Sequence, residues 1–209
     1  MIIDRRTILS RIALLPIAGT FIAGRATAAG PTPFTEIGPF YPVVRPAEQD
    51  MDLTLIGNGP RAAGEVIEVV GRILDPAGRP IPGARMEMWQ ANAAGRYAHA
   101  GDPGPRPLDP NFQGYGTLTA GADGAYRITS VLPGAYPIPG GVTRPPHLHF
   151  DVTGRNERLI TQMIFPGNPL NDTDVVLANV DRKPLTCRDM GKAGNGAHRF
   201  EWDIVLSNG

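Results

Sequence analysis

The chain has 209 residues, with 20 Lys and Arg against 20 Asp and Glu, so its formal net charge is zero. This balance argues against a nucleic acid or an anionic membrane surface as the partner, since both attract basic proteins. With 26 Gly, 22 Pro and a single Cys, the composition favours short strands joined by many turns and excludes an internal disulfide.

Residues 1–28 have the layout of an export signal. Arg5 and Arg6 precede an apolar run over residues 12–23, and small residues at 26–28 form a cleavage site. Adjacent arginines ahead of a modest apolar run resemble a twin-arginine signal. The alternative is a short membrane anchor, but the run is short for a span. We therefore expect cleavage after Ala28, no stable membrane span, and a periplasmic or extracellular location.

Residues 29–64 are expected to form an N-terminal arm with loops. The arm begins with the segment PTPFTEIGPFYPVVRPAEQD, residues 31–50. Its prolines prevent a regular helix and disfavour a central strand, because each removes a backbone donor. The arm is therefore predicted to be irregular and to precede the main domain.

The rest of the chain, residues 65–209, contains a series of strand-like segments. Met86 and Met88 share one face of such a segment, opposite Glu87 and Trp89. Residues 121–125, GADGA, indicate a hairpin turn, and residues 172–180 a short helix. The pattern predicts an all-β domain, an antiparallel β-sandwich with long loops and at most short helices. The expected strands are residues 65–74, 84–90, 115–119, 125–131, 147–153, 159–165 and 200–206.

The segment RPPHLHF, residues 144–150, contains two histidines on one predicted strand. His147 and His149 would face the same side, with Leu148 pointing away. Paired imidazoles are a common beginning of a transition-metal site, although two histidines on a solvated sheet face would show the same pattern. The sequence has no Cys-x-x-Cys, so a thiolate zinc site is excluded.

Oxygen ligands could come from two sources. Asp151 continues the histidine face, so His147, His149 and Asp151 could hold a divalent metal. Tyr97 and Tyr136 lie in loops rich in Gly and Pro, where functional groups often occur. A trivalent ion would remove the proton from each phenol, and two phenolates with two imidazoles would suit ferric iron.

Six motifs, taken in order, resemble those of the intradiol ring-cleavage dioxygenases of catechols, and above all the protocatechuate 3,4-dioxygenase branch on its iron-bearing subunit. The motifs cover nearly all of the chain after residue 28, and their order and spacing make the resemblance specific. They are GPFYP (38–42), WQANAAGRYAH (89–99), LDPNFQGYG (108–116), PGAYP (133–137), RPPHLHF (144–150) and TQMIFPG (161–167).

The resemblance implies a β-sandwich that binds Fe(III) and cleaves a catechol with O2 between its two hydroxyl-bearing carbons, giving a cis,cis-muconate. Tyr136 would also be catalytic, leaving the iron when substrate binds and accepting a proton. Arg144 would lie beside the substrate ring as a catalytic and substrate-binding residue. The implied iron ligands are Tyr97, Tyr136, His147 and His149.

Two further positions carry substrate-binding expectations. Gln162, in the TQMIFPG motif, matches a glutamine that lines the family's pocket. Tyr41, in GPFYP, is expected to pack the arm and to contribute to the pocket. Ile138 stands where an aromatic residue is expected in the protocatechuate branch, so protocatechuate is one candidate among several catechols. The sequence leaves room for a homo-oligomer or a partner subunit.

Two alternatives have different consequences. A non-catalytic β-sandwich would bind a catechol or iron without consuming O2. An enzyme with a divalent metal on His147, His149 and Asp151 would tolerate replacement of either tyrosine by phenylalanine.

Overall fold

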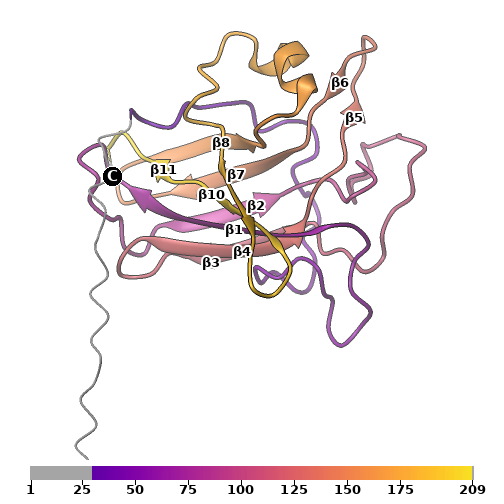
Figure 1. Ribbon diagram of the computed structural model, residues 1–209, viewed down its shortest axis with the longest axis horizontal. Coiled ribbons are helices and arrows are strands. Elements are labelled where there is room, and N and C mark those ends of the chain that lie inside the picture. Colours follow the sequence, from indigo (N-terminus) through magenta and orange to yellow (C-terminus); the bar gives the residue numbers. More distant parts are fainter. Residues whose placement is uncertain (1–29, 209) are drawn as a thin grey trace, which may run out of the picture.

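The computed structural model describes residues 30–208, so the predicted export signal and its cleavage site lie outside the described residues. Two sheets face each other and enclose the core (Figure 1). Between residues 30 and 208, no helix combines the length and apolar character needed to cross a membrane. The all-β sandwich expected from the sequence is confirmed.

The first sheet is built around β1, which pairs antiparallel with β4 along one edge and parallel with β10 and β11 along the other. Strand β9, at the edge of this sheet, pairs antiparallel with β10. These strands are β1 (Val66–Leu74), β4 (Ala125–Val131), β9 (Arg188–Lys192), β10 (His198–Glu201) and β11 (Ile204–Val205). The parallel pairings are an addition to the antiparallel pattern that the sequence predicts.

The second sheet has the order β3-β2-β7-β8 and is antiparallel throughout. A small hairpin of β5 and β6 and two 3-10 helices lie together at one end of the molecule (Figure 1). The bounds are β2 (Arg85–Trp89), β3 (Tyr115–Thr119), β5 (Tyr136–Pro137), β6 (Thr143–Arg144), β7 (His147–Thr153), β8 (Arg158–Ile164), η1 (Pro169–Thr173) and η2 (Val175–Leu177).

Strand β7 separates apolar from polar side chains between the two faces of this sheet. Leu148, Phe150 and Val152 are fully buried in the core, and each contributes roughly 1.5–3 kcal/mol by burial. His147 and His149 therefore face the outer side, as the alternation predicts. A one-residue slip would exchange the two sets, so the core fixes which side the histidines face.

Most of the predicted strands are confirmed, but the hairpin at residues 121–125 is wrong. The turn itself is present, with Gly124 N–H donating to Gly121 O at 2.9 Å. However, β3 pairs with β2 whereas β4 pairs with β1, so the turn connects the two sheets. Each flanking strand finds its partner in an earlier strand, which a local turn signal does not reveal.

The C-terminal part differs in detail from the prediction. The expected strand 200–206 is divided into β10 and β11, because Trp202 leaves the strand pairing between them and binds the Val70 carbonyl at 2.9 Å. The helix expected over residues 172–180 is replaced by the 3-10 turns η1 and η2. Strands β5, β6 and β9 were not predicted, since two of them have only two residues each and β9 is fully exposed.

Gly71 permits the close approach of β1 to the segment between β10 and β11. A Cβ atom at this position would lie 1.7 Å from the Trp202 carbonyl oxygen, far inside van der Waals contact. The clash is with backbone, which cannot rotate away as a side chain does. The parallel pairing therefore requires glycine here.

We predict that Gly71→Ala lowers the free energy of unfolding by at least about 2 kcal/mol, because strands of the first sheet must separate to admit the methyl group. Urea unfolding monitored by tryptophan fluorescence measures the change. Gly194→Ala is the matched control, since its Cβ would meet open space, and it should stay within about 0.5 kcal/mol of the wild type. Equal stabilities for the two variants would contradict the argument.

Candidate metal centre

The N-terminal arm runs along the edge of β8 that does not pair with β7. Thr35 N–H donates to the Ile160 carbonyl at 2.9 Å, and the Thr161 hydroxyl donates to the Pro33 carbonyl at 2.8 Å. The Gln162 amide donates to the Glu36 carbonyl at 3.2 Å. The arm is thereby anchored next to the histidine-bearing strand.

Four side chains form a row across the outer face of this sheet. The strand register places Tyr115 opposite Trp89, Trp89 opposite His149, and His149 opposite Gln162. Because opposite residues of an antiparallel pair point to the same face, the phenol, indole, imidazole and amide are neighbours. The sheet therefore acts as a rigid base for His149.

The two histidines bring their Nε2 atoms together at 3.2 Å. Two imidazole nitrogens bound to one ion at about 2.1 Å would be about 3.0 Å apart at a right angle and about 3.4 Å apart at a tetrahedral angle. The observed separation of His147 and His149 falls in this range. Both side chains are buried, with 2% exposure each.

A backbone contact determines which nitrogen of His147 carries the proton. Its Nδ1 lies 2.7 Å from the Pro145 carbonyl oxygen, which can only accept a hydrogen bond. The proton of the neutral ring is therefore on Nδ1, and Nε2 is the unprotonated nitrogen, whose lone pair faces Tyr136, Arg144 and His149. Second-layer contacts of this kind orient histidine ligands in metal sites.

His149 is held by packing instead of a hydrogen bond to Nδ1. Its ring stacks on Trp89 with centroids 4.9 Å apart and an interplanar angle of 7°. On the arm, Gly38 approaches so closely that a Cβ there would lie 3.1 Å from His149 Cε1. The φ angle of Gly38 is +75°, a conformation that side chains with a Cβ rarely adopt.

Tyr136 and Tyr97 bring two phenols to the same place from separate segments. Tyr136, on β5, has its hydroxyl 3.3 Å from His147 Nε2. Tyr97 follows β2 in a loop, and its ring meets that of Tyr136 edge-on with centroids 5.3 Å apart. The Tyr97 hydroxyl is buried without a hydrogen-bond partner in the described structure. A buried polar group without a partner calls for an explanation, and ligation of an ion is one that the neighbouring imidazoles make specific here.

Arg144, on β6, points one end of its guanidinium at the histidines. Its Nη1 lies 3.3 Å from His147 Nε2. Its other nitrogens bind Gln162 Oε1 at 2.8 Å and the Asp174 carboxylate at 2.9 and 3.2 Å. Asp174 was missed by the sequence analysis, because it lies 30 residues from Arg144 in an irregular segment with no local signal.

Burial makes the cluster electrically neutral apart from the arginine. Burial, and next the Arg144 charge, lowers the pKa of His147 well below its usual value and that of His149 to about 3. Burial also raises the pKa of Tyr97 well above, and that of Tyr136 above, the normal value for a phenol. Both imidazoles are therefore unprotonated, as metal ligands must be. The residues present suit an ion with mixed nitrogen and oxygen preference.

Asp151 does not join the cluster. Its carboxylate binds the Arg158 guanidinium at 2.6 Å. It also lies opposite Glu87 in the strand register, and Glu87 pairs with Arg45 at 3.0 Å. Among residues 30–208, no group of three or more His, Cys, Asp or Glu side chains could hold a metal ion. The alternative site with Asp151 is therefore not supported.

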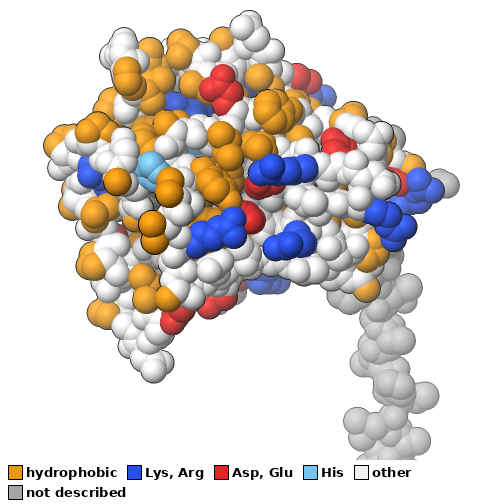
Figure 2. Space-filling view, turned by 180° about the vertical axis from the view of Figure 1, so that it is seen from behind, with side chains coloured by type: hydrophobic (Ala, Val, Ile, Leu, Met, Phe, Trp, Pro, Cys, Tyr) orange, Lys and Arg blue, Asp and Glu red, His pale blue; other side chains and the backbone are white. Residues whose placement is uncertain are grey.

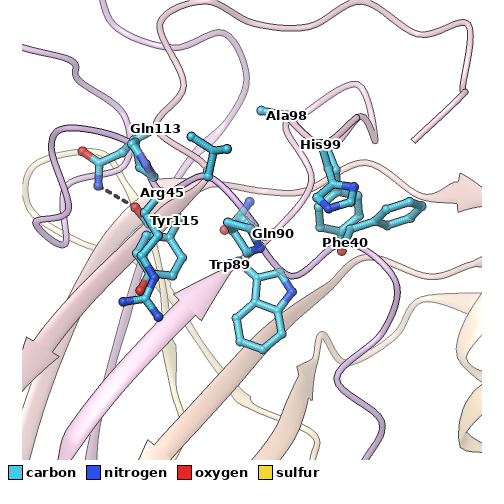
Figure 3. Close-up of a pocket in the computed structure, with 13 residues that line it drawn as sticks. Phe40, Arg45, Trp89, Gln90, Ala98, His99, Gln113 and Tyr115 are labelled. Atoms are coloured by element: carbon cyan, nitrogen blue, oxygen red, sulfur yellow. Dashed lines mark hydrogen bonds between the residues drawn. The ribbon is translucent and has the colours of Figure 1, made fainter. Parts of the chain in front are cut away.

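A pocket of about 250 Å³ adjoins the cluster through the rings of Tyr97 and Trp89. Phe40 and His99 lie together on one side of it, and Arg45 and Tyr115 on the other (Figure 3). Its volume is slightly below the roughly 300–1,000 Å³ of typical small-molecule pockets. The pocket is thus of a size for a small ligand.

The three residues predicted to bind substrate lie around the centre but do not line this pocket. Tyr41 packs edge-on against Trp89, with centroids 5.0 Å apart, and its hydroxyl donates to Glu87 at 2.6 Å. Gln162 is fully buried between Arg144 and the arm. Their predicted roles remain predictions, and the structure adds Arg45 and His99 as pocket residues.

The outer rim of the pocket is partly apolar. Val44 lines the pocket and is 86% exposed, and its neighbour Val43 is 84% exposed. Figure 2 shows hydrophobic side chains gathered around a histidine on one side of the face opposite to that in Figure 1. An apolar rim suits entry of an aromatic compound.

Comparison with known proteins yields a consistent result. A family model described as Dioxygenase matches residues 37–208. The chain is 42% identical over 171 residues to the protocatechuate 3,4-dioxygenase beta chain of Burkholderia cepacia, covering 77% of this chain and 72% of that protein. It is 34% identical over 202 residues to the hydroxyquinol 1,2-dioxygenase of Rhizobium sp. (strain MTP-10005), covering 86% of this chain and 66% of that protein.

A solved structure is also similar. The dioxygenase domain of a dioxygenase carbohydrate-binding protein fusion from Streptomyces sp. SirexAA-E superposes with a TM-score of 0.63 at 26% identity. The match covers 85% of this chain and 98% of that domain. The sandwich described above is thus the fold of a known dioxygenase domain.

We predict that the metal-free protein loses stability as the pH falls below the normal pKa of histidine. The unfolded chain binds protons there, whereas the folded state keeps His147 and His149 neutral. Each histidine should remove about 1 kcal/mol of unfolding free energy between about pH 7 and about pH 5.5. Urea unfolding of the metal-free protein at the two pH values measures this loss.

His149→Asn should remove about half of this pH dependence. His198→Asn is the control with the opposite sign, because a hydrogen bond to Asp189 raises the pKa of His198. His198 therefore adds stability at low pH that is lost as the pH rises through its folded pKa, and removing it should enlarge the acid-induced loss. An unchanged pH dependence in His149→Asn would refute the buried neutral state.

Proposed function

The chain belongs to the intradiol ring-cleaving dioxygenase family, and we propose that it is a non-haem Fe(III) enzyme that cleaves a single-ring catechol with O2, between the two hydroxyl-bearing carbons. Membership follows from the match over residues 37–208 and from the 42% identity to a protocatechuate 3,4-dioxygenase beta chain. The observation that carries the proposal is the convergence of two neutral imidazoles and two buried phenols. The product would be a cis,cis-muconate-type acid.

Tyr97, Tyr136, His147 and His149 would hold the iron. The supporting facts are the 3.2 Å separation of the two Nε2 atoms, the unprotonated Nε2 of His147, and the buried Tyr97 hydroxyl that has no partner in the described structure. When bound, Fe(III) would supply Lewis-acid activation of the diol towards O2. Two phenolates would balance part of the charge of a trivalent ion in a buried site.

Tyr136 is the phenol suited to proton transfer. Burial raises its pKa, so its phenolate oxygen would be a stronger base than that of an exposed tyrosine. It belongs to the two-residue strand β5, whereas the histidines belong to the seven-residue β7. We propose that Tyr136 Oη accepts one hydroxyl proton of the catechol as the substrate binds, while the histidines stay in place.

Arg144 would stabilise negative charge on the substrate. Its Nη1 is the nitrogen that faces the centre, and its side chain is only 5% exposed. A fixed N–H donor acts strongly where water is excluded, because it needs no reorientation as charge develops. The guanidinium is therefore placed to act on the deprotonated diol.

The substrate ring would meet an apolar environment. Trp89, Tyr97 and Tyr136 form one aromatic cluster, with Phe40 and Ile138 packed against it. Arg45 is a cation on the pocket wall, but its guanidinium already binds Glu87 and Tyr41. A catechol without a charged substituent therefore fits these contacts, and protocatechuate would require Arg45 to leave Glu87.

A visible spectrum of the purified full-length protein, before and after anaerobic addition of catechol, tests the proposal. We expect a broad tyrosinate-to-Fe(III) band that moves to longer wavelength with catechol. Admission of O2 should restore the first spectrum, consume one O2 per catechol and release a muconate. A protein that binds stoichiometric iron without colour would refute the tyrosinate ligands. A shift without O2 consumption would indicate the non-catalytic binding protein.

Replacing tyrosine by phenylalanine removes only the phenol oxygen, so it distinguishes the proposed tyrosine ligands from other buried tyrosines. We predict that Tyr97→Phe and Tyr136→Phe each weaken the charge-transfer band and lower kcat/KM by about a hundredfold or more. Tyr126→Phe is the matched control, because Tyr126 is also a buried tyrosine but lies in the core between the sheets, where its hydroxyl donates to the Trp202 carbonyl at 2.6 Å. It should keep both the band and the activity.

The divalent-metal alternative makes the reverse prediction. If Tyr97→Phe and Tyr136→Phe both kept full activity, phenol ligation would be refuted. Iron content measured by atomic absorption on the same samples distinguishes loss of the metal from loss of the band alone.

A further inference from the structure

We propose that Asp174 is a positioning residue that sets the direction in which Arg144 presents its guanidinium to the metal centre. The inference rests on the proposed function, in which Arg144 acts on the bound diol. Asp174 itself contacts neither histidine nor tyrosine of the centre in the described hydrogen bonds. It would act on the reaction only through the arginine.

The contacts divide the guanidinium into a held edge and a presented edge. Asp174 Oδ1 accepts from Arg144 Nε at 3.2 Å, and Oδ2 accepts from Nη2 at 2.9 Å. Gln162 Oε1 accepts from the same Nη2 at 2.8 Å. A paired fork of this type fixes the plane of the guanidinium as well as its position. Nη1 is left to point at His147 Nε2, 3.3 Å away.

Burial makes this arrangement difficult to replace by solvent. The side chains of Arg144 and Asp174 are 5% and 1% exposed. A buried cation without its partner is strongly unfavourable, so removal of the carboxylate would drive the guanidinium to seek other contacts. Without Asp174, Gln162 would hold only Nη2 of the guanidinium. A single hydrogen bond would let the guanidinium plane of Arg144 rotate.

A purely local role for Asp174 explains only part of its contacts. Its Oδ1 also accepts from Val176 N–H at 3.1 Å and so caps the short helix η2. Its Oδ2 has Arg144 as its sole described hydrogen-bond partner. Capping of η2 therefore uses only Oδ1, whereas Oδ2 binds only Arg144 among the described hydrogen bonds.

Asp174→Asn tests the proposal with the least change of shape. We expect the variant to bind iron and show the charge-transfer band, while kcat for catechol falls about tenfold or more through the misdirected donor. Asp172→Asn is the matched control, because Asp172 is two residues away, exposed, and without a side-chain hydrogen bond in the described structure. It should keep the wild-type kcat. Asp174→Ser, which retains a cap acceptor for Val176, is measured in parallel in case the asparagine variant does not fold.

A double-mutant cycle distinguishes positioning from a structural role. If Asp174 acts through Arg144, the double variant Arg144→Gln/Asp174→Asn should have the kcat of Arg144→Gln alone, within about twofold. If Asp174→Asn lowers kcat by the same factor in both backgrounds, the proposal is overturned. A wild-type kcat in both Asp174→Asn and Asp174→Ser would also overturn it.

A stability cycle on the same four proteins gives a readout without catalysis. The unfolding free energies should be non-additive, with the double variant less destabilised than the sum of the single variants, because it removes both buried charges. Additive values would show that the two side chains are not coupled and would overturn the proposal. A wild-type protein without catechol turnover would refute the proposed function instead, and the stability cycle would still decide whether Asp174 holds Arg144.

Discussion

The alternation of side chains along β7 is the constraint on which the site depends. Leu148, Phe150 and Val152 are fixed in the core between the sheets, so the histidines must face the opposite side. Neither imidazole is then placed by a flexible loop, and the pairing of β7 with strands on both edges prevents sliding. The packing of the core thus determines how the two imidazoles are placed.

Charge on the same face is arranged so that the histidine cluster stays free of carboxylates. Glu87 and Asp151 are opposite each other, two residues along their strands from the Trp89–His149 pair. Two like charges in such a pair repel each other. Arg45 and Arg158 neutralise them from the exposed side. Arg144 is the charged group that reaches the cluster, and Asp174 balances it from behind. The cluster therefore combines two neutral imidazoles with one positive hydrogen-bond donor, Arg144.

Sequence reasoning succeeded where chemistry follows strand periodicity. The side to which His147 and His149 point follows from their spacing of two residues. The choice of Tyr97 and Tyr136 as further ligands came from the family resemblance, and both rings lie beside the histidines. Sequence reasoning failed where partners are distant in the chain. The β3–β4 turn was read as a hairpin because nothing local shows that both strands pair elsewhere. Asp174 has no motif, since only the fold brings η2 beside Arg144, and Asp151 continued the periodic pattern but was already bound by Arg158.

The N-terminal arm covers His149 and Tyr97 and buries polar atoms beneath it. Gly38 adopts a positive φ to pass over His149, and Phe40 covers Tyr97 with ring centroids 4.7 Å apart. Beneath them, the Tyr97 hydroxyl is buried without a partner in the described structure, which lowers the stability of the fold. A cation bound by the folded state alone would offset that penalty. If these residues hold iron as proposed, the same burial would favour tight retention of the ion and would link the stability of the sandwich to metal binding.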